Sequence, residues 1–68
     1  MTVGARLKQT IASLKSVEGT IATFASVEPD NEASAVYKRN SDRIKRVVSE
    51  LEKRLAAVEF EEPQYKGL

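Results

Sequence analysis

Few side chains in this 68-residue sequence are suited to catalysis or metal binding. The chain contains no Cys and no His, two residue types that commonly act as nucleophile, general base or zinc ligand. The only adjacent carboxylates, Glu61 and Glu62, stand with Glu59 just before Pro63, where we expect an exposed helix end. We therefore predict no catalytic residue, no cofactor, no metal site and no enzyme activity.

Basic residues gather in the second half of the chain. Residues 33–58 contain seven Lys or Arg and three acidic residues, although the net charge of the chain is only +1. Arg39, Arg46 and Lys53 are candidate partner contacts, because a basic helix face can bind phosphates. No aromatic residue is interleaved with them for base stacking, and no pattern of a turn followed by a recognition helix is present. Nucleic-acid binding is therefore the alternative function rather than the first.

The stretches on either side of Pro29 have helical periodicity. We expect a helix over about 3–26, a turn over 27–31, a second helix over 32–61 and a tail over 62–68. Asp30 or Asn31 can cap the second helix, and Pro63 should end it. Apolar residues recur in steps of three and four, which predicts a packed seam. The seam comprises Leu7, Leu14, Val17, Ile21, Phe24, Tyr37, Ile44, Val48, Leu51, Leu55 and Val58.

A short connection between two helices makes them antiparallel neighbours. The predicted fold class is therefore all-α, a single antiparallel two-helix hairpin. Phe24 and Tyr37 should meet near the turn, and the acidic helix end at Glu59 should lie beside Arg6 and Lys8. A chain of this length buries too little surface to be stable alone, and without Cys it has no disulfide to compensate. We expect a homodimer or higher oligomer that closes a four-helix bundle.

The outward side of the first helix carries little charge. Its non-seam positions are small or hydroxylic, whereas a solvent-facing helix normally carries more charge. This side would allow close approach of a second protomer, or it is an exposed helix of low charge. We favour self-association through Ala12, Ser16, Gly19 and Thr23.

The remaining features concern the tail and the location of the protein. Tyr65 in the tail can dock as part of an extended peptide or fold back over the open end of the hairpin. No apolar run approaches the ~18 residues of a membrane span, so we predict no membrane insertion and a cytoplasmic protein. The absence of Cys leaves the redox compartment open.

Both ends of the chain carry a family pattern. Met1-Thr2-Val3-Gly4, the run from Leu7 to Lys15, and the closing Glu61-Glu62-Pro63-Gln64-Tyr65-Lys66-Gly67 resemble a family of short proteins of unknown function, DUF1657. The acidic turn before Ala33 is similar as well. The resemblance covers essentially the whole chain, and the basic middle of the second helix departs from it.

The resemblance implies a function connected with sporulation. The family occurs in endospore-forming bacteria, where its genes often neighbour those for spore membrane proteins of the SpoVA type. It implies a sporulation-associated cytosolic or spore-core protein with no known enzymatic activity, and it brings no catalytic or ligand residues to this chain. The leading hypothesis is a structural or interaction protein that self-associates and acts with a spore membrane complex. The alternative is a nucleic-acid-associated or spore-core packing protein that uses the basic face.

Overall fold

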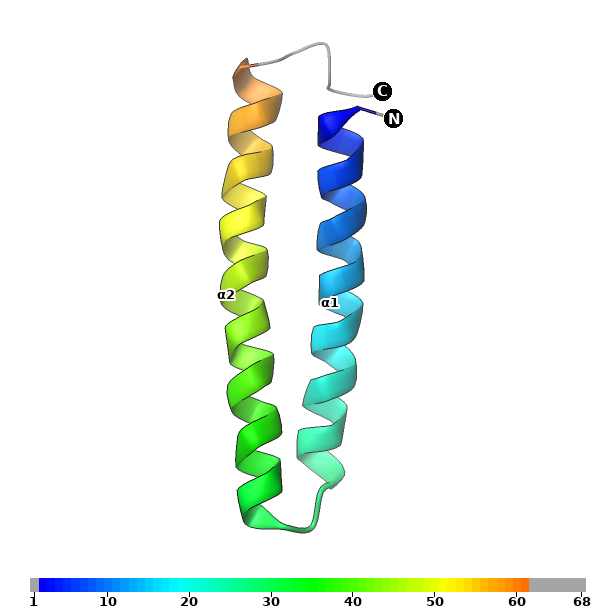
Figure 1. Ribbon diagram of the computed structural model, residues 1–68, viewed down its shortest axis with the longest axis vertical. Coiled ribbons are helices and arrows are strands. Elements are labelled where there is room, and N and C mark those ends of the chain that lie inside the picture. Colours follow the sequence, from blue (N-terminus) through cyan, green and yellow to red (C-terminus); the bar gives the residue numbers. More distant parts are fainter. Residues whose placement is uncertain (1, 62–68) are drawn as a thin grey trace.

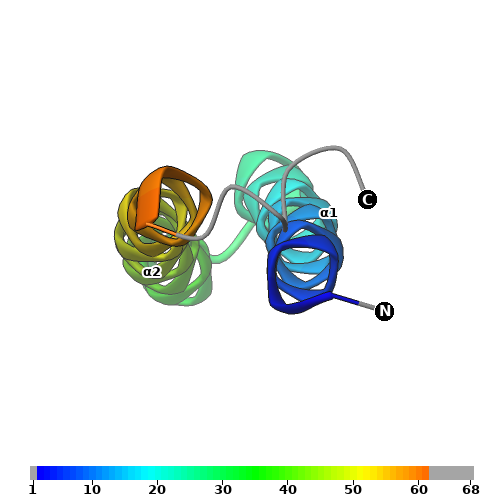
Figure 2. The same ribbon diagram turned by 90° about the horizontal axis from the view of Figure 1, so that it is seen from above.

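The computed structural model describes residues 2–61 of the chain. Two helices, α1 (Val3–Val27) and α2 (Asn31–Glu61), run antiparallel and are joined by a short turn (Figure 1). Seen from above, they lie side by side in one layer (Figure 2). The Cα atoms extend over 49 × 17 × 11 Å, so the hairpin is one helix thick. The predicted all-α hairpin is confirmed, with no strand between residues 2 and 61. The sequence predicts helix limits of 26 and 32 at the turn, where the structure has 27 and 31.

The ends of α1 follow from the residues beside them. Oγ1 of Thr2 accepts a 3.0 Å hydrogen bond from the Ala5 amide, one of the amides that a helix start leaves without a partner. At the other end, Glu28 adopts extended backbone (φ −71°, ψ 119°). The following Pro29 accounts for this conformation, because a proline ring disfavours the helical conformation of the residue before it.

The start of α2 is fixed by two side chains. Asp30 Oδ2 accepts a 2.9 Å hydrogen bond from the Ala33 amide, so the N-cap is Asp30, one of the two predicted candidates. The Ser34 hydroxyl donates a 2.7 Å hydrogen bond to the Ala25 carbonyl. In a continuing helix that carbonyl would accept from the amide of residue 29, but Pro29 has none. Ser34 therefore supplies the missing donor and ties the first turn of α2 to the last turn of α1.

The helices meet along residues spaced by seven. From the turn outward, the row is defined by the hydrogen-bonded pairs Ala25–Ser34 and Glu18–Ser41. The same spacing places Ile11 opposite Val48 and Gly4 opposite Leu55. Ile11, Val48 and Ser41 are only 6%, 7% and 3% exposed, and Gly4 is also buried. A seven-residue repeat keeps one row of each helix facing the other. This row is therefore the centre of the hairpin.

The observed seam lies one residue away from the predicted row on α1. Most predicted seam residues are buried or half-buried beside the central row: Leu7, Leu14, Ile21, Tyr37, Ile44, Val48, Leu51, Leu55 and Val58. Val17 and Phe24 are exposed, because Glu18 and Ala25 occupy the central positions next to them. Phe24 still packs on Tyr37, with ring centroids 5.8 Å apart and planes inclined by 54°, so the predicted contact near the turn is confirmed.

Candidate interaction surfaces

The most polar contact between the helices lies in the middle of the hairpin. The Ser41 hydroxyl donates a 2.8 Å hydrogen bond to Oε1 of Glu18, and Lys45 Nζ lies 3.5 Å from the same oxygen. The Glu18 side chain is only 19% exposed, whereas that of Lys45 is 63% exposed. Shielded polar groups are costly without partners. This cluster satisfies its own hydrogen bonds and thereby fixes how the two helices align.

Sequence reasoning misses Glu18, because a charged residue is not expected on a seam. One signal could have found it: Ser41 stands within the apolar seam of α2, where a hydroxyl requires a partner. On α1, Glu18 stands seven residues before Ala25. On α2, Ser41 stands seven residues after Ser34. The Ser34 contact at the turn therefore implies the contact in the middle.

Two further ion pairs cross between the helices on one side of the hairpin. Lys8 Nζ lies 3.2 Å from Glu59 Oε2, and Lys15 Nζ lies 3.1 Å from Glu52 Oε2. The first pair confirms that the acidic end of α2 lies beside the basic start of α1. Exposed pairs of this kind contribute only about 0–1 kcal/mol each. We call the side that carries these pairs and the Glu18–Lys45 pair the polar face.

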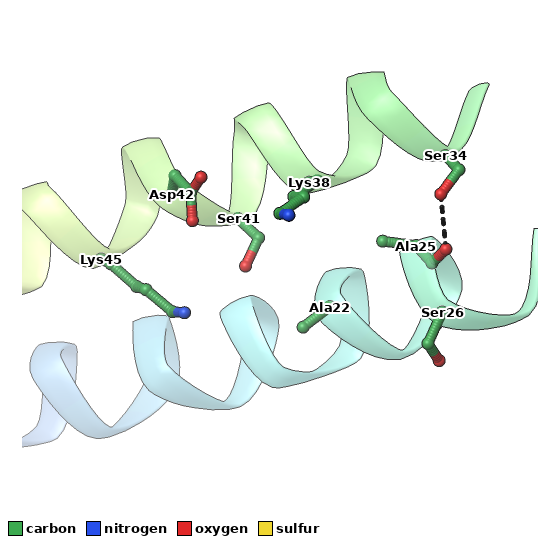
Figure 3. A pocket seen from close by; sticks show the side chains of 8 residues that line it. All are labelled: Ala22, Ala25, Ser26, Ser34, Lys38, Ser41, Asp42 and Lys45. Carbon is green, nitrogen blue, oxygen red and sulfur yellow. Dashed lines mark hydrogen bonds between the residues drawn. The ribbon is translucent and has the colours of Figure 1, made fainter. Parts of the chain in front are cut away.

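An open groove of about 420 Å³ lies on the polar face near the turn (Figure 3). It is lined by Ala22, Ala25, Ser26, Ser34, Lys38, Ser41, Asp42 and Lys45. Ser34, Ser41 and Lys45 point toward α1, and both of these serine hydroxyls already donate to protein acceptors. The Ser26 hydroxyl donates to the Thr23 carbonyl at 2.7 Å, and the remaining polar groups are two amines and one carboxylate. The groove thus contains both signs of charge, and its serine hydroxyls already donate to protein acceptors, so it has no cluster of groups suited to one kind of ligand.

The opposite side of the hairpin is apolar. Val17, Phe24, Val36 and Val47 are 47%, 49%, 43% and 50% exposed. Each of these residues stands two positions after a residue of the polar face or its groove. Two positions along an α-helix rotate the side-chain direction by about 200°, so these four side chains point to the side opposite the polar face. Those preceding residues are Lys15, Ala22, Ser34 and Lys45. We call this side the apolar face; the half-buried Leu14, Ile21, Ile44 and Leu51 lie between its exposed residues and the seam.

The small residues predicted to mediate self-association share the outer side of α1. Ala12, Ser16, Gly19 and Thr23 are all exposed, and a Cβ added at Gly19 would meet nothing within 4 Å. The hairpin itself therefore gives no packing reason for Gly19. The Thr23 hydroxyl donates to the Gly19 carbonyl at 3.0 Å, and the neighbouring Thr20 donates to Ser16 at 3.1 Å. These hydroxyls are thus satisfied within α1.

The predicted partner contacts on α2 lie on its outer side. Arg39, Arg46 and Lys53 are exposed and spaced by seven residues, so they form one row along the helix. Lys53 Nζ lies 3.6 Å from Glu50 Oε1, and within residues 2–61 neither arginine forms an ion pair. Tyr65, the fourth predicted contact, lies outside the described residues.

Residues 2–61 hold neither an acidic metal cluster nor a candidate membrane span. No group of three or more acidic side chains there is arranged to hold a metal ion. Neither α1 nor α2 has the length and apolar character needed to cross a membrane.

These features define a class of protein: a small helical hairpin with one polar and one apolar face. Residues 7–55 match the family model described as "Protein of unknown function (DUF1657)". The match covers most of the chain, and the protein belongs to this family, as its two ends predict. No curated protein and no solved structure gives a significant match.

Proposed function

We propose that this protein is a non-enzymatic interaction protein that self-associates as a helical hairpin and acts with a spore membrane complex of the SpoVA type. The observation that carries the self-association is the small core. Among the described residues only Ile11 and Val48 are buried apolar residues, while seven large apolar side chains are exposed. One layer of secondary structure cannot cover its own apolar surface, and a second layer normally does so.

A dimer that closes a four-helix bundle would supply that second layer. Short antiparallel hairpins are suited to this arrangement, because each contributes two neighbouring helices. The polar face of each hairpin would remain toward solvent or toward another partner. The connection with sporulation rests on the resemblance of the chain to its family, and the cytosol or spore core is the proposed location.

Reciprocal capture from sporulating cells tests this function. Two differently tagged copies of the full chain are expressed together, and one tag is used for purification. The proposal predicts recovery of the second copy together with a spore membrane protein, reproducibly and in stoichiometric amounts. Recovery of neither the second copy nor a membrane protein would contradict it.

A second candidate function is association with nucleic acid through the outer row of α2. It is favoured by Arg39 and Arg46, which project into solvent without an acidic partner among the described residues. Binding of this type weakens steeply as salt rises, because phosphate contacts release counterions. Retention on DNA that disappears in an Arg39→Gln, Arg46→Gln variant would support this function. Salt-independent or absent retention would exclude it.

A further inference from the structure

We infer that the apolar face binds a second copy of this chain, with the two turns at opposite ends of the dimer. The inference rests on the proposed self-association and goes beyond it by assigning the surface and the orientation. It also differs from the sequence-based expectation, which places self-association on the small residues of α1.

The two faces differ in how far their side chains are already partnered within the hairpin. The polar face carries three ion pairs across the helices, Lys8–Glu59, Lys15–Glu52 and Glu18–Lys45. The apolar face leaves four large side chains about half exposed. Burial of apolar surface drives most protein association. The apolar face is therefore the one that gains from being covered.

The exposed side chains of the apolar face come from both helices at matching levels. Val17 of α1 and Val47 of α2 lie in the middle of the hairpin, because the Lys15–Glu52 and Glu18–Lys45 pairs bracket that level. Phe24 and Val36 lie near the turn, where Phe24 packs on Tyr37. The face is thus a two-helix surface that runs from the turn to the middle of the hairpin, and a second two-helix layer can cover it.

The broad side of the hairpin, which carries the apolar face, is large enough for a stable interface. Its Cα atoms span 49 by 17 Å, or about 830 Å², and a standard interface buries about 800 Å² per partner. A second copy has the same dimensions and so can cover the face completely. Two such layers would form the four-helix bundle.

Charge complementarity sets the orientation. Arg43 and Glu50 stand four positions before and three positions after Val47, so both are its neighbours on the surface of α2. In an antiparallel dimer with Val47 near the two-fold axis, Arg43 lies beside the partner's Glu50, and the reverse pair forms as well. A dimer with both turns at the same end would instead bring together two acidic turns, each containing Glu28, Asp30 and Glu32.

The small-residue row of α1 is the competing surface, and it provides the matched control. The test compares a Val17→Lys, Val47→Lys variant with a Ser16→Lys, Thr23→Lys variant by sedimentation equilibrium, with helix content followed by circular dichroism. We expect the first variant to weaken the dimer by at least about 100-fold and the second by less than about threefold. The opposite pattern would overturn the assigned surface but leave self-association intact. A wild-type chain that is a folded monomer would instead contradict the proposed function.

Oxidative cross-linking tests the orientation without adding charge. The chain has no cysteine, so Val47→Cys and Ser49→Cys each introduce a single thiol. Two copies of residue 47 near a two-fold axis can reach the Cα separation of about 4.4–6.8 Å that a disulfide requires. Ser49 stands about 200° around the helix from Val47 and is exposed. We expect the Val47→Cys variant to cross-link efficiently and the Ser49→Cys variant not to do so. If Val47→Cys cross-links no faster than Ser49→Cys, the antiparallel dimer is overturned.

Discussion

The hydrogen bond between Ser41 and Glu18 should contribute measurably to stability, although it joins two polar side chains inside a small core. The bond is 2.8 Å long, the hydroxyl is buried and the acceptor carboxylate is largely shielded. Hydrogen bonds to charged groups contribute about 1.5–3 kcal/mol. Because Glu18 retains some solvent access and the Lys45 contact, we expect a coupling energy of about 1.5 kcal/mol between Glu18 and Ser41.

A double-mutant cycle isolates this energy. Urea unfolding followed by circular dichroism, at one protein concentration, is compared for the wild type, Glu18→Ala, Ser41→Ala and the double variant. The cycle cancels the higher helix propensity of alanine and the loss of the Lys45 ion pair, because each appears in both arms. A matched cycle between Glu18 and Lys45 should give about 0.5 kcal/mol or less, since Lys45 is largely exposed. A Glu18–Ser41 coupling no larger than this control would refute the reasoning.

The remaining predictions concern stability, measured in the same unfolding assay. Ile11→Ala should destabilise the hairpin by about 2–4 kcal/mol, because Ile11 is one of two buried apolar residues within residues 2–61. Val27→Ala, at an exposed site, should change stability by less than about 0.5 kcal/mol. Ser34→Ala should cost about 1 kcal/mol by removing the donor to the Ala25 carbonyl. Asp30→Ala should cost about 1 kcal/mol through loss of the cap, whereas Asp30→Ser should be nearly neutral. An Ile11→Ala cost equal to that of Val27→Ala would contradict the assigned core.

Much of the fold follows from local signals in the sequence. Pro29 both ends α1, by forcing Glu28 out of helical backbone, and marks the turn, while Asp30 caps α2. These are effects between residues close in sequence, which is why the hairpin and its limits are predictable. Lys8–Glu59 pairing also follows, because it depends only on the antiparallel direction of the helices.

The face that α1 turns toward α2 was not predictable from apolar periodicity. Leu7, Leu14 and Ile21 are flanked by two possible companion rows, one through Val17 and one through Glu18. The row through Val17 has more large apolar residues, so apolar periodicity favours it for the seam. The structure takes the other row, because Ser41 donates to Glu18 and Lys45 lies beside it. A carboxylate can occupy such a position only when donors from the opposite helix are present.

The same shift changes which surfaces are available to a partner. With Glu18 in the seam, Val17 and Phe24 turn outward and join Val36 and Val47 on one face. Had Val17 been central, the hairpin would have buried more of its own apolar surface. The polar contact that aligns the helices is therefore also the reason that the apolar face exists.

Sedimentation equilibrium of the wild-type chain tests the central claim most directly. A single hairpin has a mass of 7.5 kDa. At micromolar concentration the account predicts a helical species of at least twice that mass, whose thermal stability rises with protein concentration. A fully helical 7.5 kDa monomer with concentration-independent unfolding would contradict it.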